Sequence, residues 1–219
     1  TEQAGGWYYK HNLGEGRFAP AKLVSPKPSF AGLGSGLLQL SDLDGDGGKQ
    51  LSMTGGDMKG YFELTDDDEW LPFRTFEQMP NRNLGDAFAR MLDLTGDGRP
   101  DLLLSDDHVF TWYESSGRKG FAPARRTVRP TDEESGPAIV FSDPKQTIFL
   151  ANMSGGGLTD LVRIRNGEVC YWPNLGYGRF GAKVTMDNAP VFDHPDAFNP
   201  AFLELSDIDG SGTTDIIYL

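Results

Sequence analysis

A nine-residue motif rich in aspartate and glycine recurs four times along the chain, and this repetition constrains the fold more than any other feature of the sequence. Every copy has glycine at its fourth and sixth positions. The copies begin about 55 residues apart, a period typical of the blades of a β-propeller and too long for a heptad or a leucine-rich repeat. They are Asp42–Gln50, Asp93–Asp101, Asn152–Asp160 and Asp207–Asp215.

A second motif alternates with the first and consists of an aromatic strand, a glycine-rich turn and a phenylalanine. Together the two motifs predict four strands per repeat: one before the Asp-Gly turn, one after it, the aromatic strand, and one after the phenylalanine. The copies run from Trp7 to Phe18, Trp112 to Phe121 and Tyr171 to Phe180, with a divergent copy from Tyr61 to Phe73.

The fold expected from this pattern is an all-β β-propeller built of four four-stranded repeats. Continuous apolar runs such as Leu102–Leu104 and Ile216–Ile217 predict inner strands that are buried on both faces. We expect one domain over residues 1–219, either closed as a four-bladed ring or open as an arc of a larger propeller. The approximate repeats are 1–53, 54–108, 109–166 and 167–219.

Composition supports this fold and excludes several functions. The 28 glycines and 14 prolines suit a chain with many turns. A formal net charge of −12 disfavours binding to nucleic acids or anionic membranes and favours cations and basic partners. The single cysteine excludes an internal disulfide, and no apolar run is long enough to insert into a membrane. Because Leu219 ends what looks like a strand, we expect a fragment of a longer polypeptide.

The Asp-Gly turns suggest calcium sites, because side chains at turn positions 1, 3, 5 and 9 can converge on one cation. The glycines permit the positive φ angles that such a tight turn requires. The third copy keeps only Asp160 as a carboxylate, so plain hairpin turns remain the alternative. The candidate Ca²⁺ ligands are Asp42, Asp44, Asp46, Asp93, Asp97, Asp101, Asp207, Asp209 and Asp215.

No catalytic motif is evident, and we expect a protein that is not an enzyme. The three histidines lack metal-ligand spacing, no Gly-x-Ser-x-Gly elbow occurs, and Cys170 fits a small core residue of an aromatic strand. We interpret the acidic runs Asp66–Glu69 and Asp132–Glu134 as solvated loop tips. Two interpretations remain for the tryptophans, namely sugar stacking or packing between blades. The candidate ligand-binding residues are Trp7, Trp112 and Trp172.

The last third of the chain resembles a known family. The stretch Gly167–Val184, followed by Phe192–Pro195 and Asp207–Asp215, closely resembles the propeller region of SpvB/TcaC-type toxin proteins. These proteins include the B components of bacterial insecticidal toxin complexes. The Asp-Gly turns are also similar, more loosely, to the FG-GAP/VCBS repeats of integrin-type propellers.

The resemblance implies a role in virulence through protein–protein interaction. In toxin complexes, the B and C components form a shell that encloses a cytotoxic segment, and the propeller of B docks on the pore-forming A component. The resemblance therefore implies a secreted, non-catalytic docking module that gates toxin passage, with the A and C components as partners. Ca²⁺ would stabilise its turns. The alternative is a carbohydrate-binding, lectin-like propeller.

Overall fold

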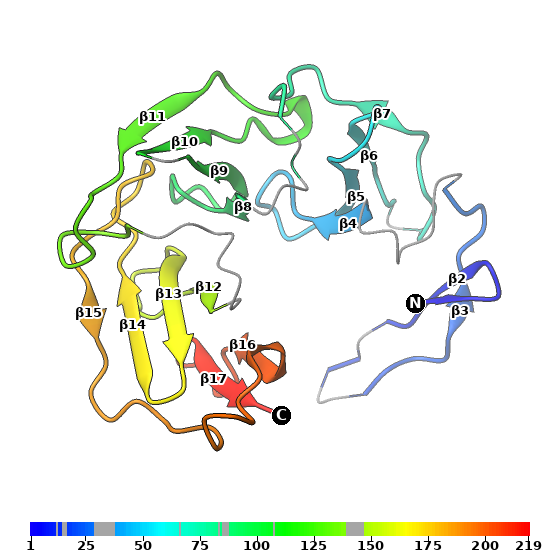
Figure 1. Cartoon of the computed structure of the whole chain (residues 1–219). Coiled ribbons are helices and arrows are strands. Elements are labelled where there is room, and N and C mark those ends of the chain that lie inside the picture. The colour runs from blue at the N-terminus through cyan, green and yellow to red at the C-terminus, as the bar shows by residue number, and fades with distance from the viewer. Residues whose placement is uncertain are drawn as a thin grey trace. The chain divides into compact units, whose positions relative to one another are not determined.

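The computed structural model describes residues 1–11, 13–14, 17–28, 38–65, 67–82, 84, 88–106, 108–138 and 147–219. These residues form antiparallel strands, with the two short 3-10 segments η2 (Gly117–Lys119) and η3 (Pro200–Phe202) (Figure 1). The expected all-β fold of four-stranded propeller repeats is confirmed. No helix among the described residues is long and apolar enough to cross a membrane. The chain divides into two compact units, 1–85 with 116–120, and 86–115 with 121–219.

The first unit contains a three-stranded and a four-stranded sheet among its described residues. Their shared core is formed by Trp7, Leu51 and Phe62, against which Trp70 packs. The strand orders are β1-β2-β3 and β4-β5-β6-β7. The bounds are β1 (Glu2–Gln3), β2 (Gly6–Tyr9), β3 (Lys22–Leu23), β4 (Leu38–Ser41), β5 (Gln50–Met53), β6 (Gly60–Phe62) and β7 (Arg74–Thr75).

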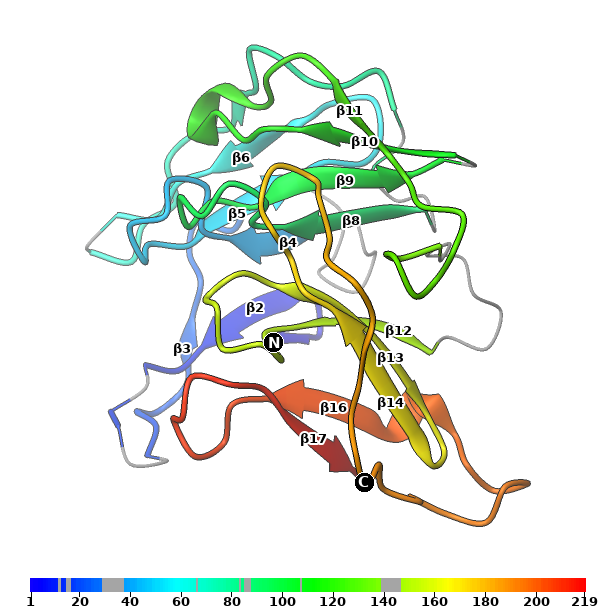
Figure 2. The same ribbon diagram turned by 90° about the vertical axis from the view of Figure 1, so that its left-hand side faces the viewer.

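The second unit contains two four-stranded sheets and one two-stranded sheet among its described residues (Figure 2). The orders are β11-β10-β9-β8, β12-β13-β14-β15 and β16-β17. The bounds are β8 (Ala89–Leu92), β9 (Asp101–Ser105), β10 (Val109–Tyr113), β11 (Arg125–Val128), β12 (Ile148–Ala151), β13 (Asp160–Arg165), β14 (Glu168–Trp172), β15 (Val184–Thr185), β16 (Leu203–Ser206) and β17 (Asp215–Tyr218).

The three four-stranded sheets follow the strand order that the two motifs predict. The Asp-Gly turns join β4 to β5, β8 to β9, β12 to β13, and β16 to β17. The aromatic segments form the third strands, and isolated bridges such as Ser115–Phe121 and Asn174–Phe180 close the turns that follow them. The second strand is deeply buried in β9, as expected. In β17, Ile216 and Ile217 are only half-buried, so the prediction of burial on both faces was wrong there.

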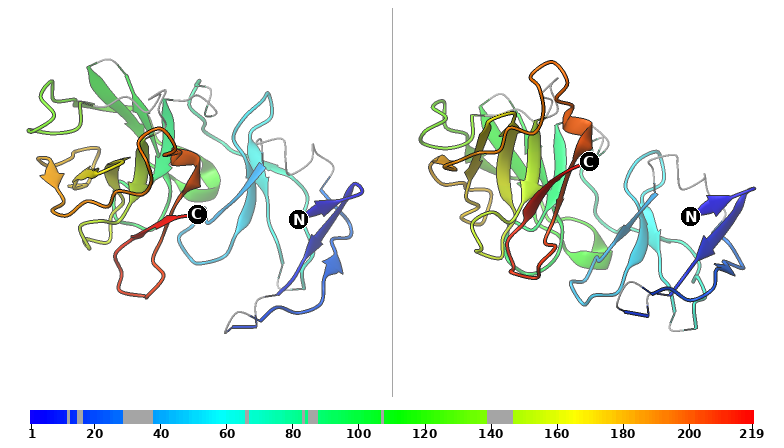
Figure 3. Two further views of the ribbon diagram at one scale, coloured as in Figure 1. Left: turned by 60° about the horizontal axis from the view of Figure 1, so that its bottom comes forward. Right: turned by 90° about the horizontal axis from the view of Figure 1, so that it is seen from below.

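Neighbouring sheets of the second unit are joined through their turns and through core side chains. The N–H of Tyr177 donates to the carbonyl of Leu94 at 2.6 Å, and Phe110 meets Phe180 at 5.6 Å between ring centroids. In the next pair of turns, the Asn152 amide donates to the carbonyl of Gly212 at 2.8 Å. The β16–β17 turn can be followed in Figure 3. These contacts fix the turns of adjacent repeats against each other.

Candidate functional sites

The first carboxylate of each acidic turn binds backbone N–H groups of its own turn. Asp42 accepts hydrogen bonds from Gly45 and Gly47 at 2.8 and 2.7 Å. Asp93 and Asp207 accept equivalent bonds from the residues three to five positions later. Partial burial acts to raise the pKa of Asp42, but these N–H groups outweigh it and lower that pKa below its ordinary value. The turn geometry therefore keeps the carboxylate of Asp42 ionised.

The ninth position closes the turn by accepting the N–H of the second position. The acceptor is Gln50 in the first turn, Asp101 in the second, Asp160 in the third and Asp215 in the fourth, over 2.8–2.9 Å. Asp160 also accepts from Ser154 at 2.8 Å and, through its other oxygen, from Asn174 at 2.8 Å. This explains why the third turn keeps Asp160 while it has no other acid.

Asp101 has the same bridging role in the second turn. Its side chain is fully buried and accepts N–H bonds from Leu94 at 2.9 Å and Ser115 at 2.6 Å. Burial raises the pKa of Asp101 to about 6, and the two N–H groups oppose that rise. Asp101 and Asp160 thus serve as buried acceptors that tie the Asp-Gly turn to the aromatic segment of the same sheet.

Of the nine predicted calcium ligands, the structure brings three together. Oxygen atoms of Asp207, Asp209 and Asp215 lie within 4.8 Å of one another, and no other acidic, histidine or cysteine group of the described residues meets this criterion. Hydrogen bonds from Ser211 lower the pKa of Asp209. Three carboxylates on one loop suit a hard cation such as Ca²⁺.

In the first and second turns the middle acids have protein partners. Asp44 forms an ion pair with Arg118 at 2.7 Å, and Asp97 accepts the N–H of Arg99 at 3.0 Å. Asp46 likewise accepts the N–H of Gly48 at 2.8 Å. The acids of the fourth turn also accept backbone N–H bonds, so what distinguishes the first two turns is an arginine beside a middle acid.

The recurring tryptophans lie in the cores of the two units. Trp7, Trp112 and Trp172 are exposed by 3%, 2% and 0%. Their rings cannot present a face to a sugar from solvent, so the structure supports the packing interpretation over stacking. Cys170 is also fully buried beside Trp172, and burial raises the pKa of its thiol, as fits a core residue.

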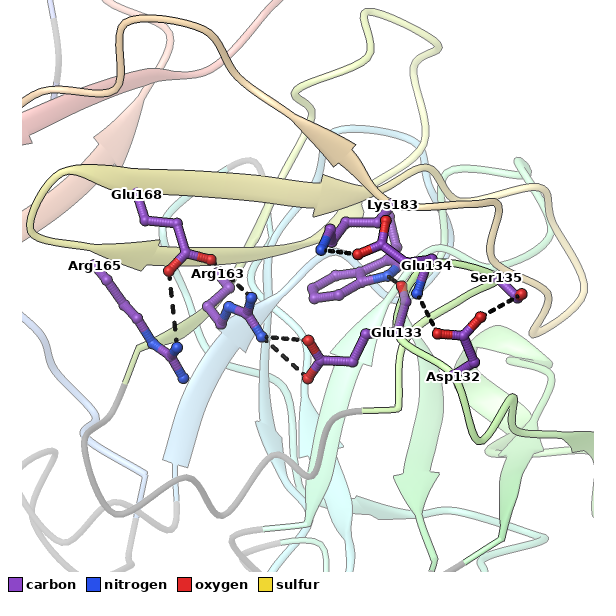
Figure 4. Close-up of polar contacts among 9 residues, drawn as sticks. Asp132, Glu133, Glu134, Ser135, Arg163, Arg165, Glu168 and Lys183 are labelled. Carbon is purple, nitrogen blue, oxygen red and sulfur yellow. Dashed lines mark hydrogen bonds and ion pairs between the residues drawn. The ribbon is translucent and has the colours of Figure 1, made fainter.

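A charged network on β13 was not anticipated from the sequence (Figure 4). Arg163 is only 7% exposed, and its guanidinium contacts Glu133 at 2.9 Å and Glu168 at 2.8 Å. Burial acts to lower the pKa of Arg163, but the hydrogen bonds to both carboxylates raise it overall. The same contact lowers the pKa of Glu168. Lys183 pairs with Glu134 beside them.

This network corrects the interpretation of the acidic run Asp132–Glu134 as a solvated loop tip at one position, Glu133, whereas Asp132 and Glu134 are exposed as expected. Glu133 is half-buried against Arg163, and the indole N–H of Trp172 donates to the Glu133 carbonyl at 2.8 Å. A buried guanidinium needs a partner of opposite charge, and the run supplies it. Sequence reasoning missed the pairing because Glu133 lies in a turn after β11 and Arg163 on β13, 30 residues apart.

Among known proteins, this chain is similar to several solved structures. No protein-family model and no curated protein sequence matches the chain. A chain of the Photorhabdus luminescens Tc holotoxin pore, determined with a mutation in TccC3, is 30% identical over 100% of this chain, with a TM-score of 0.78. This chain therefore has the fold of a Tc toxin segment. It spans 10% of the length of the toxin chain it matches.

A lectin from Agrocybe aegerita shares the fold at lower similarity. Its structure was described for the recognition of non-reducing terminal N-acetylglucosamine. The two chains are 21% identical, with a TM-score of 0.59, over 95% of this chain and 53% of the lectin. At this identity the likeness shows a common fold.

Proposed function

We propose that this chain is the non-catalytic β-propeller module of a toxin-complex B-like protein of the SpvB/TcaC type. In this role it docks on the pore-forming A component and gates the passage of the toxin held by the B and C components. One observation carries the proposal: the whole chain matches a Tc holotoxin chain at 30% identity and a TM-score of 0.78. The chain would work outside the bacterial cell that secretes it.

The construction of the sheets is compatible with docking. The turns are held by buried acceptors such as Asp160, by inter-sheet bonds such as Tyr177 to Leu94, and by the Arg163 network. A rigid scaffold of this kind presents connecting loops in fixed geometry, which is how many binding surfaces are built. The net charge of −12 favours a basic surface on the partner.

The calcium part of the proposal narrows to the fourth turn, where Asp207, Asp209 and Asp215 gather. Ca²⁺ there would neutralise three neighbouring carboxylates and stabilise the loop between β16 and β17. The first and second turns already hold a guanidinium against a middle acid, Arg118 on Asp44 and Arg99 on Asp97, so they need the ion less.

A pull-down tests docking. The chain, shown to be folded by circular dichroism, is immobilised and exposed to the A component of the cognate toxin complex. Retention of the A component on the immobilised chain supports docking. If the chain is folded and the A component passes over it without being retained, the result argues against docking. A glycan array addresses the lectin alternative, whose favoured residues Trp7, Trp112 and Trp172 are buried in this structure. If the three tryptophans serve only for packing, no glycan binding on the array depends on them.

A further inference from the structure

A pocket of about 230 Å³ lies in the first unit, between the β1–β3 sheet and the β4–β7 sheet. Its lining combines apolar side chains with a few polar ones, the composition expected of a small-molecule site. Its volume is below the roughly 300–1,000 Å³ of sites for drug-sized ligands, so it suits a single ring. The apolar lining residues are Val24, Leu40, Leu64 and Trp70, and the polar ones, called the rim below, are Tyr9, His11, Lys49 and Asp68.

Asp68 is the central polar group of the rim. Its Oδ2 accepts the hydroxyl of Tyr9 at 2.9 Å and lies 3.0 Å from Nε2 of His11. The bond from Tyr9 is the main cause that lowers the pKa of Asp68, so the group is an ionised acceptor at neutral pH. The side chain is 26% exposed and can accept a further hydrogen bond from a ligand.

The backbone holds Asp68 in an uncommon conformation. Its φ angle is +64°, in the left-handed region that costs an L-residue roughly 1–2 kcal/mol. The connection between β6 and β7 fixes this turn through the bridge between Leu64 and Trp70 and the bond from the Asp68 N–H to the Thr65 carbonyl at 3.0 Å. A polar side chain held in a strained turn at the rim of a pocket is a feature of binding sites.

The aromatic groups supply the surface for a ring. Trp70 is half-buried, in contrast to the other three tryptophans, and lines the pocket from the β6–β7 connection. Tyr9 and His11 meet edge-to-face at 5.2 Å on the opposite sheet. An indole that is packed on one side and open on the other offers its face to an apolar ligand surface.

The charges around the pocket select the ligand class. Asp68 is opposed by Lys49 on the rim and by Lys22, whose Nζ lies 5.9 Å from the Tyr9 ring centroid. An anionic ligand would face Asp68, and a cationic ligand would face the two lysines. A neutral ligand with several hydroxyl groups can use both the donors and the acceptor.

We propose that this pocket binds one neutral pyranose ring, with the C–H face of the sugar against Trp70 and its hydroxyl groups bonded to Asp68, His11 and Lys49. This binding goes beyond docking to a toxin component and does not depend on it. It differs from stacking on Trp7, Trp112 or Trp172, because those rings are buried.

The test is saturation-transfer NMR of the full chain with methyl β-D-glucopyranoside, methyl β-D-galactopyranoside and methyl α-D-mannopyranoside. N-acetyl-arginine amide serves as a cationic probe in the same experiment. The variants are Asp68→Asn, which changes the rim acceptor, and Glu69→Gln, which makes the matched change in an exposed neighbour that does not line the pocket. Circular dichroism confirms that both variants are folded.

The expected result is transfer to at least one pyranoside, with affinity reduced roughly tenfold or more in Asp68→Asn and unchanged in Glu69→Gln. A second variant, Trp70→Phe, should reduce transfer to the ring C–H protons. Three outcomes overturn the proposal: no transfer to any pyranoside from folded chain, equal transfer with Asp68→Asn, or selective transfer to the arginine probe.

Discussion

Replacing Asp160 with asparagine should strongly destabilise the second unit. The carboxylate is fully buried and accepts three backbone N–H bonds, from Met153, Ser154 and Asn174. These donors approach two different oxygens, and asparagine has only one acceptor oxygen. In Asp160→Asn the amide NH₂ must therefore face at least one buried N–H group.

The magnitude follows from this loss of an acceptor. A buried donor without a partner costs about 1–3 kcal/mol, and bonds to a charged acceptor are stronger than neutral ones. The expected loss in Asp160→Asn is about 3 kcal/mol. Asp215→Asn is the matched control, because Asp215 has the same turn position but is half-buried and closes the turn through one N–H, that of Ile208. Its expected loss is below about 1 kcal/mol.

The assay is urea unfolding monitored by hydrogen exchange in peptides from β13 and from β16–β17. Local readout is needed because the chain has two compact units, and a single transition cannot be assumed. A loss in Asp160→Asn that is no greater than the loss in Asp215→Asn would refute the assignment of Asp160 as the buried acceptor that organises the third turn.

Three further predictions concern other turns. Burial raises the pKa of Asp101 from 3.8 to about 6, so its contribution to stability is present below about pH 4 and is lost as pH rises through about 6. In urea titrations, the free energy of unfolding of the wild type relative to that of Asp101→Asn should fall by up to about 3 kcal/mol between these pH values. A difference in unfolding free energy between the two proteins that does not change with pH would contradict this. Gly120→Ala should destabilise the first unit by more than about 2 kcal/mol, because its Cβ would lie 1.9 Å from the Gln78 carbonyl oxygen at a φ of +104°. Gly47→Ala, also at positive φ but in open space, should cost only about 1 kcal/mol. Thermal melts of both variants measure these losses, and equal losses would contradict the steric argument. Calorimetry should detect Ca²⁺ binding at millimolar concentration that Asp209→Asn abolishes, and heat unchanged in that variant would contradict a site in the fourth turn.

The repeat pattern alone predicted the strand order of the three four-stranded sheets. It did so because strand alternation, turn glycines and aromatic spacing are local properties of the sequence. Gly96 and Gly98 in the second turn adopt positive φ angles of 83° and 80°, as the motif requires. The buried strand β9 also followed from the run of leucines.

The chemistry of the turns was less predictable. The sequence showed oxygen-bearing side chains at regular positions, and these suit either a cation or backbone N–H groups. The structure shows that Asp101 and Asp160 are buried acceptors, and that Asp44 is paired with Arg118. Such assignments depend on burial and on residues distant in the sequence, which spacing within one turn does not reveal.

The pocket around Asp68 and the pair of Arg163 with Glu133 depend on tertiary structure in the same way. Tyr9 and Asp68 are 59 residues apart, in two different copies of the aromatic motif, and the motif does not show that their side chains meet. The signals that were visible were a polar aromatic residue at the end of a strand and an acidic run in a connection. Both signals are common on protein surfaces, so only the folded structure shows that these residues belong to a pocket or an ion pair.

Competition between this chain and an intact B component for the A component tests the proposed docking most directly. The A component is immobilised for biolayer interferometry, and the intact B component is applied with increasing amounts of the folded chain. The proposal predicts saturable binding of the chain alone and progressive loss of the B signal as the chain occupies the same surface. Undiminished binding of B in the presence of excess folded chain, with no binding of the chain itself, would contradict it.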